Sequence, residues 1–226
     1  MNSQFTIHDA QLSPRLSALA ALVLPGSVAA DIGTDHARLP IWLVSGGVCP
    51  RAVACDIAAG PLAAAARNIA WAGLAGRIQT RLGDGLAALG PGEADTVIIA
   101  GMGGENIAAI LARCEWAKSP DIRWLLQPMT RPERLREYLY ANGFAVKQEE
   151  VARERRRLYL ILSAVYTGER KPFSVADCYT GALPCTPDGQ ACLRGVIRRL
   201  EKQAAGGDPE AGEILREIRR NVQCIM

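Results

Sequence analysis

The sequence predicts an α/β fold in which a mostly parallel sheet carries helices on both faces, followed by a small helical unit. From residue 27 onward, short apolar β-type runs alternate with helical stretches, the pattern of parallel strands joined by crossover helices. After residue 167 the composition shifts to Pro, Gly, Cys and Asp, and two periodic helical segments follow. A length of 226 residues suits one full domain and an appendage.

The individual elements follow from these runs. Seven strands are predicted, over residues 27–31, 52–56, 78–82, 96–100, 122–127, 144–149 and 158–165. A first helix begins at Pro14 behind Ser13, and further helices are predicted over residues 40–45, 61–72, 85–89, 105–114 and 132–142. The first five strands therefore alternate with helices.

The last two strands break this alternation. The segment 149–157 is short and charged, whereas two parallel strands need a connection of about a dozen residues. We therefore expect an antiparallel hairpin at the end of the sheet. A doubly wound sheet that ends in this way resembles the seven-stranded methyltransferase fold more than that of a dehydrogenase.

The C-terminal part is predicted to be a helical hairpin. Residues 168–186 are interpreted as a linker, Thr186 caps a helix that starts at Pro187, and Asp208 caps a second helix that starts at Pro209. Gly206 and the glycine after it join the two helices, so we expect an antiparallel pair of coiled-coil type. The predicted domains are residues 1–167 and 168–226.

Composition excludes several classes of protein. No apolar run approaches the roughly 18 to 20 residues of a membrane span, and the first helix lacks the basic flank of a signal peptide, so a cytoplasmic protein without membrane association is expected. The seven cysteines are odd in number and contain no C-x-x-C pair, and there are only two histidines. We therefore expect no metal site.

The end of the first strand carries the first candidate site. In open α/β sheets, ligands bind outside the carboxyl ends of the strands, where this chain reads Asp-Ile-Gly-Thr-Asp-His-Ala from Asp31 to Ala37. Gly33 permits a tight turn before Thr34, but Asp35 stands where a dinucleotide-binding motif has its second glycine. A carboxylate there repels a pyrophosphate and suits a ligand with a positive centre. This favours S-adenosylmethionine over a nicotinamide cofactor.

The next two strand ends add two acids. Asp56 lies 23 residues beyond Gly33, near the offset of roughly 20 residues at which a carboxylate binds ribose hydroxyls. Asp84 lies between Gly83 and Gly85, where it could accept a hydrogen bond from an adenine amino group. Each acid alone could be a turn residue that caps a helix. Together, at successive strand ends, they predict an adenosine pocket.

The fourth strand ends in the glycine-rich string Ala100-Gly101-Met102-Gly103-Gly104. Three glycines in five residues indicate that the backbone comes close to another group, which we expect to be the acceptor of the transferred group. As an isolated string, it could also be an ordinary strand-to-helix turn.

These motifs, with Leu39-Pro40, Gly60-Pro61 and Leu126-Gln127-Pro128, resemble the bacterial tRNA (adenine(22)-N1)-methyltransferase family, often called TrmK, in order and spacing over residues 12–165. The resemblance implies a Rossmann-like class I methyltransferase domain with a C-terminal coiled-coil domain. It also implies methyl transfer from S-adenosylmethionine to N1 of adenine 22 in the D-arm region of tRNA. Arg38 departs from an aromatic residue common in the family, and Asp56 from a frequent Glu.

The expected site residues fall into three groups. Those expected to bind the cofactor are Asp31, Gly33, Thr34, His36, Asp56, Ile57, Gly83, Asp84, Gly85, Ala100 and Gly101. Those expected to bind the substrate are Met102, Gly103, Gly104, Gln127, Pro128, Arg153, Arg155, Arg156 and Arg157. Neutral adenine N1 already has a lone pair, so we expect positioning to dominate and Asp35 to stabilise the cationic product ring. His36 is a weaker candidate for that role.

The charge distribution points to RNA. The net charge is only +3, but residues 131–171 hold ten Lys or Arg against six Asp or Glu. The Arg153–Arg157 cluster is interpreted as a phosphate-binding surface, with a solvated strand edge as the alternative. Two other functions stay open: a methyltransferase for another RNA or a small molecule, and a non-catalytic RNA-binding module. A monomer is expected.

Overall fold

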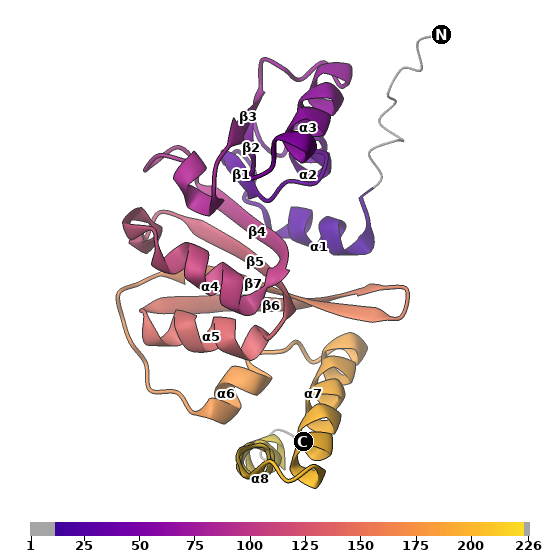
Figure 1. The fold of residues 1–226 in the computed structure, drawn as a ribbon, viewed down its shortest axis with the longest axis vertical. Helices are drawn as coiled ribbons and strands as arrows, with labels where there is room; N and C mark the ends of the chain where they lie inside the picture. Colours follow the sequence, from indigo (N-terminus) through magenta and orange to yellow (C-terminus); the bar gives the residue numbers. More distant parts are fainter. Residues whose placement is uncertain (1–11, 224–226) are drawn as a thin grey trace.

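The structure is a computed structural model that describes residues 12–223, and its centre is one sheet of seven strands (Figure 1). The strands are β1 (Ala29–Ile32), β2 (Ala52–Asp56), β3 (Ile78–Leu82), β4 (Thr96–Gly103), β5 (Arg123–Thr130), β6 (Phe144–Glu154) and β7 (Arg157–Tyr166). Their order across the sheet is β3-β2-β1-β4-β5-β7-β6. The first five strands are parallel, as predicted, and the chain reverses direction across the sheet between β1 and β4.

The antiparallel hairpin at the end of the sheet is confirmed, but its strands are longer than predicted. β7 lies between β5 and β6 and runs antiparallel to both. The pairing of β6 with β7 continues to Glu154 opposite Arg157, with Arg155 and Arg156 as the turn. Here the hairpin projects beyond the rest of the sheet, as Figure 1 shows, so charged side chains can point to solvent while the backbone stays paired.

Helices cover both faces of the sheet. One face carries α1 (Pro14–Leu22), α2 (Arg38–Ser45) and α3 (Ala59–Trp71), whose Leu19, Leu43 and Ile69 share one buried core. The other carries the 3-10 helices η2 (Gly85–Ala88) and η3 (Glu115–Lys118), with α4 (Gly104–Ala112) and α5 (Pro132–Ala141) packed into a second core. The helix predicted over residues 85–89 is therefore only one short 3-10 turn.

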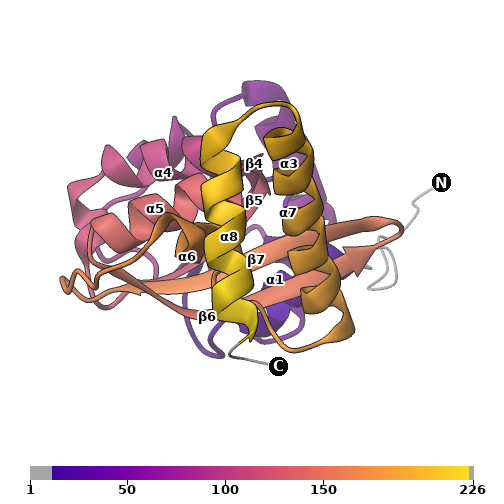
Figure 2. The same cartoon turned by 90° about the horizontal axis from the view of Figure 1, so that it is seen from below.

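The C-terminal unit contains three helices, one more than predicted. α6 (Val175–Thr180) lies inside the predicted linker and begins with a reciprocal capping box between Ser174 and Asp177. α7 (Pro187–Ala205) and α8 (Pro209–Gln223) start at the predicted caps and run antiparallel, side by side (Figure 2). Residues of all three helices form a third, separate buried core.

Polar contacts hold this C-terminal unit on the sheet domain. Arg136 of α5 forms a two-point ion pair with Glu149 of β6 and donates from Nη1 to the carbonyl of Cys178 at 2.8 Å. On the other side, Arg153 of β6 donates from Nε to Asp188 in the first turn of α7 at 2.9 Å. Strand β6 therefore contacts the C-terminal unit through residues at two points along its length.

Candidate active site

An open cavity of about 470 Å³ lies at the carboxyl ends of β1, β2 and β4, where the chain reverses direction across the sheet. It brings together seven of the predicted residues with five others. Its lining is Ile32, Gly33, Asp56, Ile57, Gly83, Asp84, Gly85, Met102, Asn106, Ala109, Ile110 and Arg113. The strand-end motifs, up to 70 residues apart in sequence, thus meet in one pocket.

The end of β1 is held by hydrogen bonds to its neighbour β2. The backbone N–H groups of Gly33 and Thr34 both donate to the carbonyl of Cys55, at 2.8 and 2.9 Å. The Thr34 hydroxyl donates to Asp31 at 2.7 Å. Burial raises the pKa of the Asp31 carboxyl to about 6, against the lowering effects of the Thr34 hydrogen bond and the Arg15 charge. Asp31 and Thr34 therefore lie beneath the pocket, not in its lining.

The Asp35-His36 turn protrudes at the rim. His36 and Ala37 both have left-handed backbone angles, φ 58° and 54°, which residues with a Cβ rarely adopt. Asn68 of α3 donates to the His36 carbonyl at 2.9 Å, and His36 Nε2 lies 3.3 Å from Asp35 Oδ1. The Asp35 side chain is 86% exposed. The strained turn therefore presents an accessible carboxylate and imidazole two and three residues after Gly33, which lines the pocket.

The end of β2 contributes a partly engaged acid and an exposed apolar side chain. Asp56 Oδ1 accepts from the backbone N–H of Ala58 at 2.7 Å. No hydrogen bond to its Oδ2 is found among the described residues. Ile57, the next residue, is 67% exposed although it is apolar. This pairing of a carboxylate oxygen with an apolar surface suits a ribose and the base attached to it.

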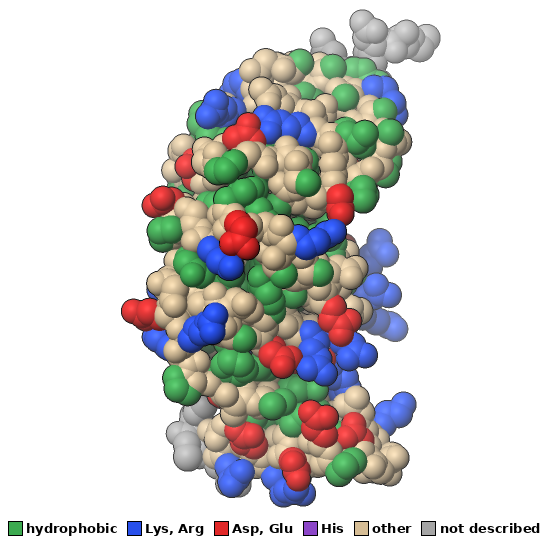
Figure 3. Space-filling view, turned by 60° about the vertical axis from the view of Figure 1, so that its left-hand side comes forward, with side chains coloured by type: hydrophobic (Ala, Val, Ile, Leu, Met, Phe, Trp, Pro, Cys, Tyr) green, Lys and Arg blue, Asp and Glu red, His purple; other side chains and the backbone are tan. Residues whose placement is uncertain are grey.

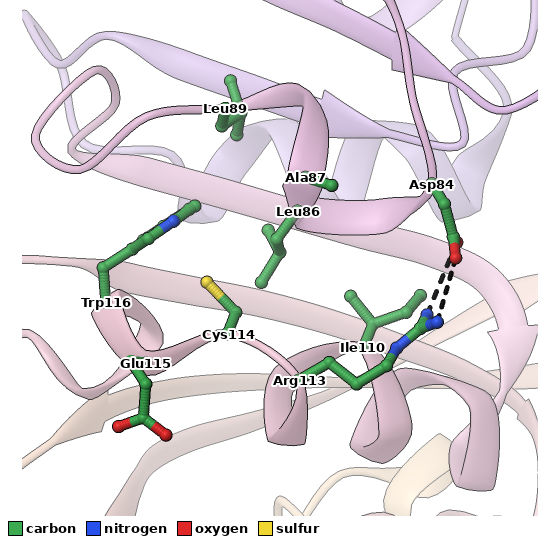
Figure 4. Close-up of a pocket in the computed structure, with 9 residues that line it drawn as sticks. All are labelled: Asp84, Leu86, Ala87, Leu89, Ile110, Arg113, Cys114, Glu115 and Trp116. Carbon is green, nitrogen blue, oxygen red and sulfur yellow. Dashed lines mark hydrogen bonds and ion pairs between the residues drawn. The ribbon is translucent and has the colours of Figure 1, made fainter.

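Asp84 is not free, and its partner is a residue that the sequence analysis missed. Arg113, directly after α4, donates to Asp84 Oδ2 at 2.9 Å and to Oδ1 at 3.4 Å (Figure 4). Behind this pair lies a second cavity of about 310 Å³, lined by Leu86, Trp116 and other side chains around η2 and η3. Asn106, Ala109, Ile110 and Arg113 recur at offsets of three, four and seven, so helical spacing could have placed them on one face.

The glycine-rich end of β4 approaches the protein's own backbone. A Cβ on Gly104 would collide with the carbonyl of Arg131, and one on Gly33 would collide with the side chain of Met102. Gly101 has φ +81°. The sequence predicts that the close neighbour of these glycines is the acceptor. For Gly104 the close neighbour is instead Arg131, a residue with the left-handed φ of 52° that follows β5.

Gln127 and Pro128 are buried at the end of β5 and so do not offer an open binding surface. Gln127 Oε1 accepts from the Gly101 backbone N–H at 3.2 Å and from Arg15 Nη1 at 2.9 Å. The Gln127 side chain therefore supports the Gly101 loop through a hydrogen bond to its backbone.

The predicted arginine cluster divides into two parts. Arg153 pairs with Asp188, whereas Arg155, Arg156 and Arg157 are exposed at the tip of the β6–β7 hairpin. Figure 3 shows Lys and Arg side chains gathered along one edge of the molecule, at the height of this hairpin and below it. The tip arginines are therefore accessible to a large ligand.

A third cavity, the junction cavity, lies between the end of β5 and the C-terminal unit. It measures about 400 Å³ and is lined by Met129, Thr130, Arg131, Pro132, Glu133, Tyr179, Arg199 and Gln203. Arg199 lies over the Tyr179 ring, 5.7 Å from its centroid, and donates to Glu133 at 3.2 Å. This cavity starts where the Gly104 turn meets Arg131.

The described residues contain neither a candidate metal site nor a candidate membrane span. Between residues 12 and 223, no group of three or more His, Cys, Asp or Glu side chains is arranged to hold a metal ion. In the same part of the chain, no helix has the length and apolar character needed to cross a membrane.

The strand order, terminal antiparallel hairpin and acid-lined pocket define a methyltransferase of the Rossmann-like class. In agreement, the family model for a methyltransferase domain matches residues 12–162. A Bacillus subtilis tRNA (adenine(22)-N(1))-methyltransferase is 38% identical over 158 residues, which cover 70% of this chain and 66% of that protein, just under two thirds of its length.

Solved structures agree along nearly the whole chain. A Streptococcus pneumoniae protein described as a candidate tRNA (m1A22) methyltransferase, crystallised with S-adenosyl-L-methionine, is 31% identical with a TM-score of 0.82, over 93% of this chain and 99% of that one. M. capricolum TrmK, crystallised with S-adenosyl-homocysteine, is 27% identical with a TM-score of 0.80, over 95% of this chain and 99% of that one. This chain belongs to the tRNA (adenine(22)-N1)-methyltransferase family, as its motifs predicted.

Proposed function

We propose that this protein transfers a methyl group from S-adenosylmethionine to N1 of adenine 22 in the D-arm region of tRNA. The observation that carries the proposal is the meeting of Asp56, Asp84 and the Met102 loop in one pocket beside the exposed Asp35. Family membership supports the identity of the substrate. We also propose that the protein works as a monomer in the cytoplasm.

The pocket residues fit the cofactor. Asp56 Oδ2 is placed to accept from ribose hydroxyls, and Asp84, held in one orientation by Arg113, to accept from the adenine amino group. Ile57 and Ile110 offer apolar contact to the adenine ring. When bound, S-adenosylmethionine supplies an electrophilic methyl group on a positively charged sulfur. The acids at the end of β1 suit that charge.

Asp35 is the proposed catalytic residue. Adenine N1 attacks with its own lone pair, so the protein has to hold an unstacked base in line and stabilise the cationic ring that forms. The Asp35 carboxylate is accessible, and among the described residues its ion-pair partner is the half-exposed His36. It can therefore stabilise the developing charge and accept the N6 proton afterwards. His36 orients this carboxylate in the proposal.

The RNA would lie on the face that carries the hairpin tip and the junction cavity. Arg155, Arg156 and Arg157 are the proposed phosphate contacts, and Arg131 and Arg199 extend the basic surface towards the Gly104 turn. Arg153 has a different role, since Asp188 holds its guanidinium against α7. Of the four arginines predicted as one RNA-binding surface, three are thus proposed to contact RNA and Arg153 joins β6 to α7.

The decisive experiment is methylation of unmodified bacterial tRNA with labelled S-adenosylmethionine, followed by mapping of the labelled nucleoside. We expect 1-methyladenosine at position 22, none on a tRNA with guanine at that position, and a drop in turnover of about 100-fold or more for Asp35→Asn. Label at another position or on another RNA would favour the other substrate class. Absence of transfer with intact RNA binding would favour a non-catalytic RNA-binding module.

A further inference from the structure

Arg15 contacts the active-site loop although its helix does not line the pocket. It lies in the first turn of α1, half-buried, with its guanidinium carbon 5.7 Å from the centre of the Tyr159 ring. Its Nη1 donates to Gln127 Oε1 at 2.9 Å across 112 residues of sequence. An arginine held between an aromatic ring and a buried amide has a fixed direction.

Gln127 uses both ends of its amide group. Its oxygen accepts from Arg15 and from the Gly101 backbone N–H, at 2.9 and 3.2 Å, and its nitrogen donates to the Pro128 carbonyl at 3.0 Å. If the amide were flipped, its N–H groups would face the N–H donors of Arg15 and Gly101. Its oxygen would face the Pro128 carbonyl oxygen, so all three hydrogen bonds would be lost. The side chain is 0% exposed, so water cannot replace these contacts. Arg15, the Gly101 N–H and the Pro128 carbonyl therefore all favour the one amide orientation that holds Gly101.

The hydrogen bond to Gly101 matters because the pairing of β4 with β5 skips this residue, although Ala100 and Met102 on either side of it are paired. Gly101 has φ +81°, and the pairing of β4 with β5 shifts register between Ala100 and Met102. A glycine at such an irregularity has the widest conformational freedom of any residue. Met102, the next residue, lines the pocket and contacts Gly33. The direction of the Gly101 N–H thus sets where the β4 end meets the cofactor pocket.

We propose that Arg15 is a positioning residue for methyl transfer, which acts through the Gln127 amide to fix the Gly101 loop between cofactor and target base. The proposal rests on the proposed function, because it assigns the loop a place in that reaction. Arg15 touches neither the cofactor pocket nor the strand-end acids by a hydrogen bond among the described residues. Besides the charge that acts on the buried Asp31, its effect on the loop is on geometry, and a small misplacement of reacting groups costs as much as about 100-fold in rate.

The test compares Arg15→Ala, Arg15→Lys and Gln127→Leu with Arg67→Ala, an exposed arginine on α3 that serves as the matched control. In the full-length protein we expect Arg15→Ala to lower single-turnover methylation about 10- to 100-fold. The dissociation constant for S-adenosylmethionine and the tRNA Michaelis constant should each change less than about threefold, because the binding residues remain. Arg15→Lys, which keeps a charged donor, should recover part of the rate. Arg67→Ala should match the wild type.

Two further readouts decide whether Arg15 acts through Gln127. The double variant Arg15→Ala with Gln127→Leu should be no slower than the slower single variant, because both break the same chain of hydrogen bonds. Hydrogen exchange of the Gly101 amide should accelerate in both single variants. Unchanged exchange, fully additive rate losses, or wild-type turnover in Arg15→Ala would each overturn the proposal. The exchange measurement needs no tRNA, so failure of the wild type to methylate tRNA would count against the proposed function alone.

Discussion

Replacing Arg136 by methionine should destabilise the protein more than any surface substitution. Arg136 is 1% exposed and its partner Glu149 is 0% exposed, so methionine, of similar volume, leaves a buried carboxylate without its counter-charge. It also removes the donor that binds the carbonyl oxygens of Cys178 and Tyr179 at the end of α6. Breaking a buried pair in this way costs about 3 to 5 kcal/mol.

The loss in the free energy of unfolding can be measured by urea titration, with circular dichroism as the signal. For a chain of this length, 3 to 5 kcal/mol corresponds to a fall in melting temperature of roughly 6 to 20 °C. The matched control is Arg134→Ala, which removes an exposed ion pair with Glu137 in the same helix and should cost about 1 kcal/mol or less. The double variant Arg136→Met with Glu149→Leu should regain most of the loss, because no charge then remains buried. An Arg136→Met protein as stable as the Arg134→Ala control would refute this reasoning.

Four further predictions follow from the site and the domain arrangement. Asp56→Ala should weaken S-adenosylmethionine binding by about 10- to 150-fold in calorimetry with an unchanged melting temperature, and unchanged affinity would remove Asp56 from the pocket. Folding raises the pKa of Asp31 from 3.8 to about 6, so the folded state binds this proton more tightly than the unfolded state. The free energy of unfolding should therefore fall by up to about 3 kcal/mol as the pH rises from 4 to 6. Asp31→Asn should therefore be more stable than the wild type at pH 8 and equal to it below about pH 4 in urea titrations, whereas parallel pH curves would contradict the assignment. Replacing Arg155 and Arg156 by Ala should raise the tRNA Michaelis constant and reduce the salt slope of binding by about 0.7 to 0.9 per lost contact, and an unchanged slope would make the tip a solvated edge. Truncation after Thr167 should retain cofactor binding and lose efficient tRNA methylation; full activity would limit residues 168–226 to a structural role, and lost cofactor binding would mean that the boundary is misplaced.

The strands, their alternation with helices and the meeting of the strand-end acids were predictable because they depend on local signals. β2 and β3 have the predicted bounds, since the apolar run of β2 ends at Asp56 and the β3 segment ends before Gly83. The acids at these ends then meet because parallel strands share one edge. Gly33 and Met102 meet for the same reason, because β1 and β4 are parallel neighbours and both residues lie at their carboxyl ends.

What escaped prediction depends on contacts between distant residues. Arg113 pairs with Asp84 across 29 positions and Arg15 with Gln127 across 112. Helical spacing could have placed Arg113 on the pocket face of α4, but nothing in the local sequence indicates the partner of either arginine. α6 was missed because a six-residue helix has too few turns to show a period, and it is stabilised by its capping box and by Arg136. Arg153 was grouped with its exposed neighbours because only the fold brings Asp188 within reach.

The two attachment points on β6 restrict how the enzyme can adapt to its RNA. Glu149 anchors the end of α6 through Arg136, and Arg153 anchors the start of α7, four residues or about 13 Å further along one strand. A body fixed at two separated points on a paired strand cannot swing about a single hinge. Strand β6 and the C-terminal helices are therefore expected to move as one body when a large ligand such as RNA binds.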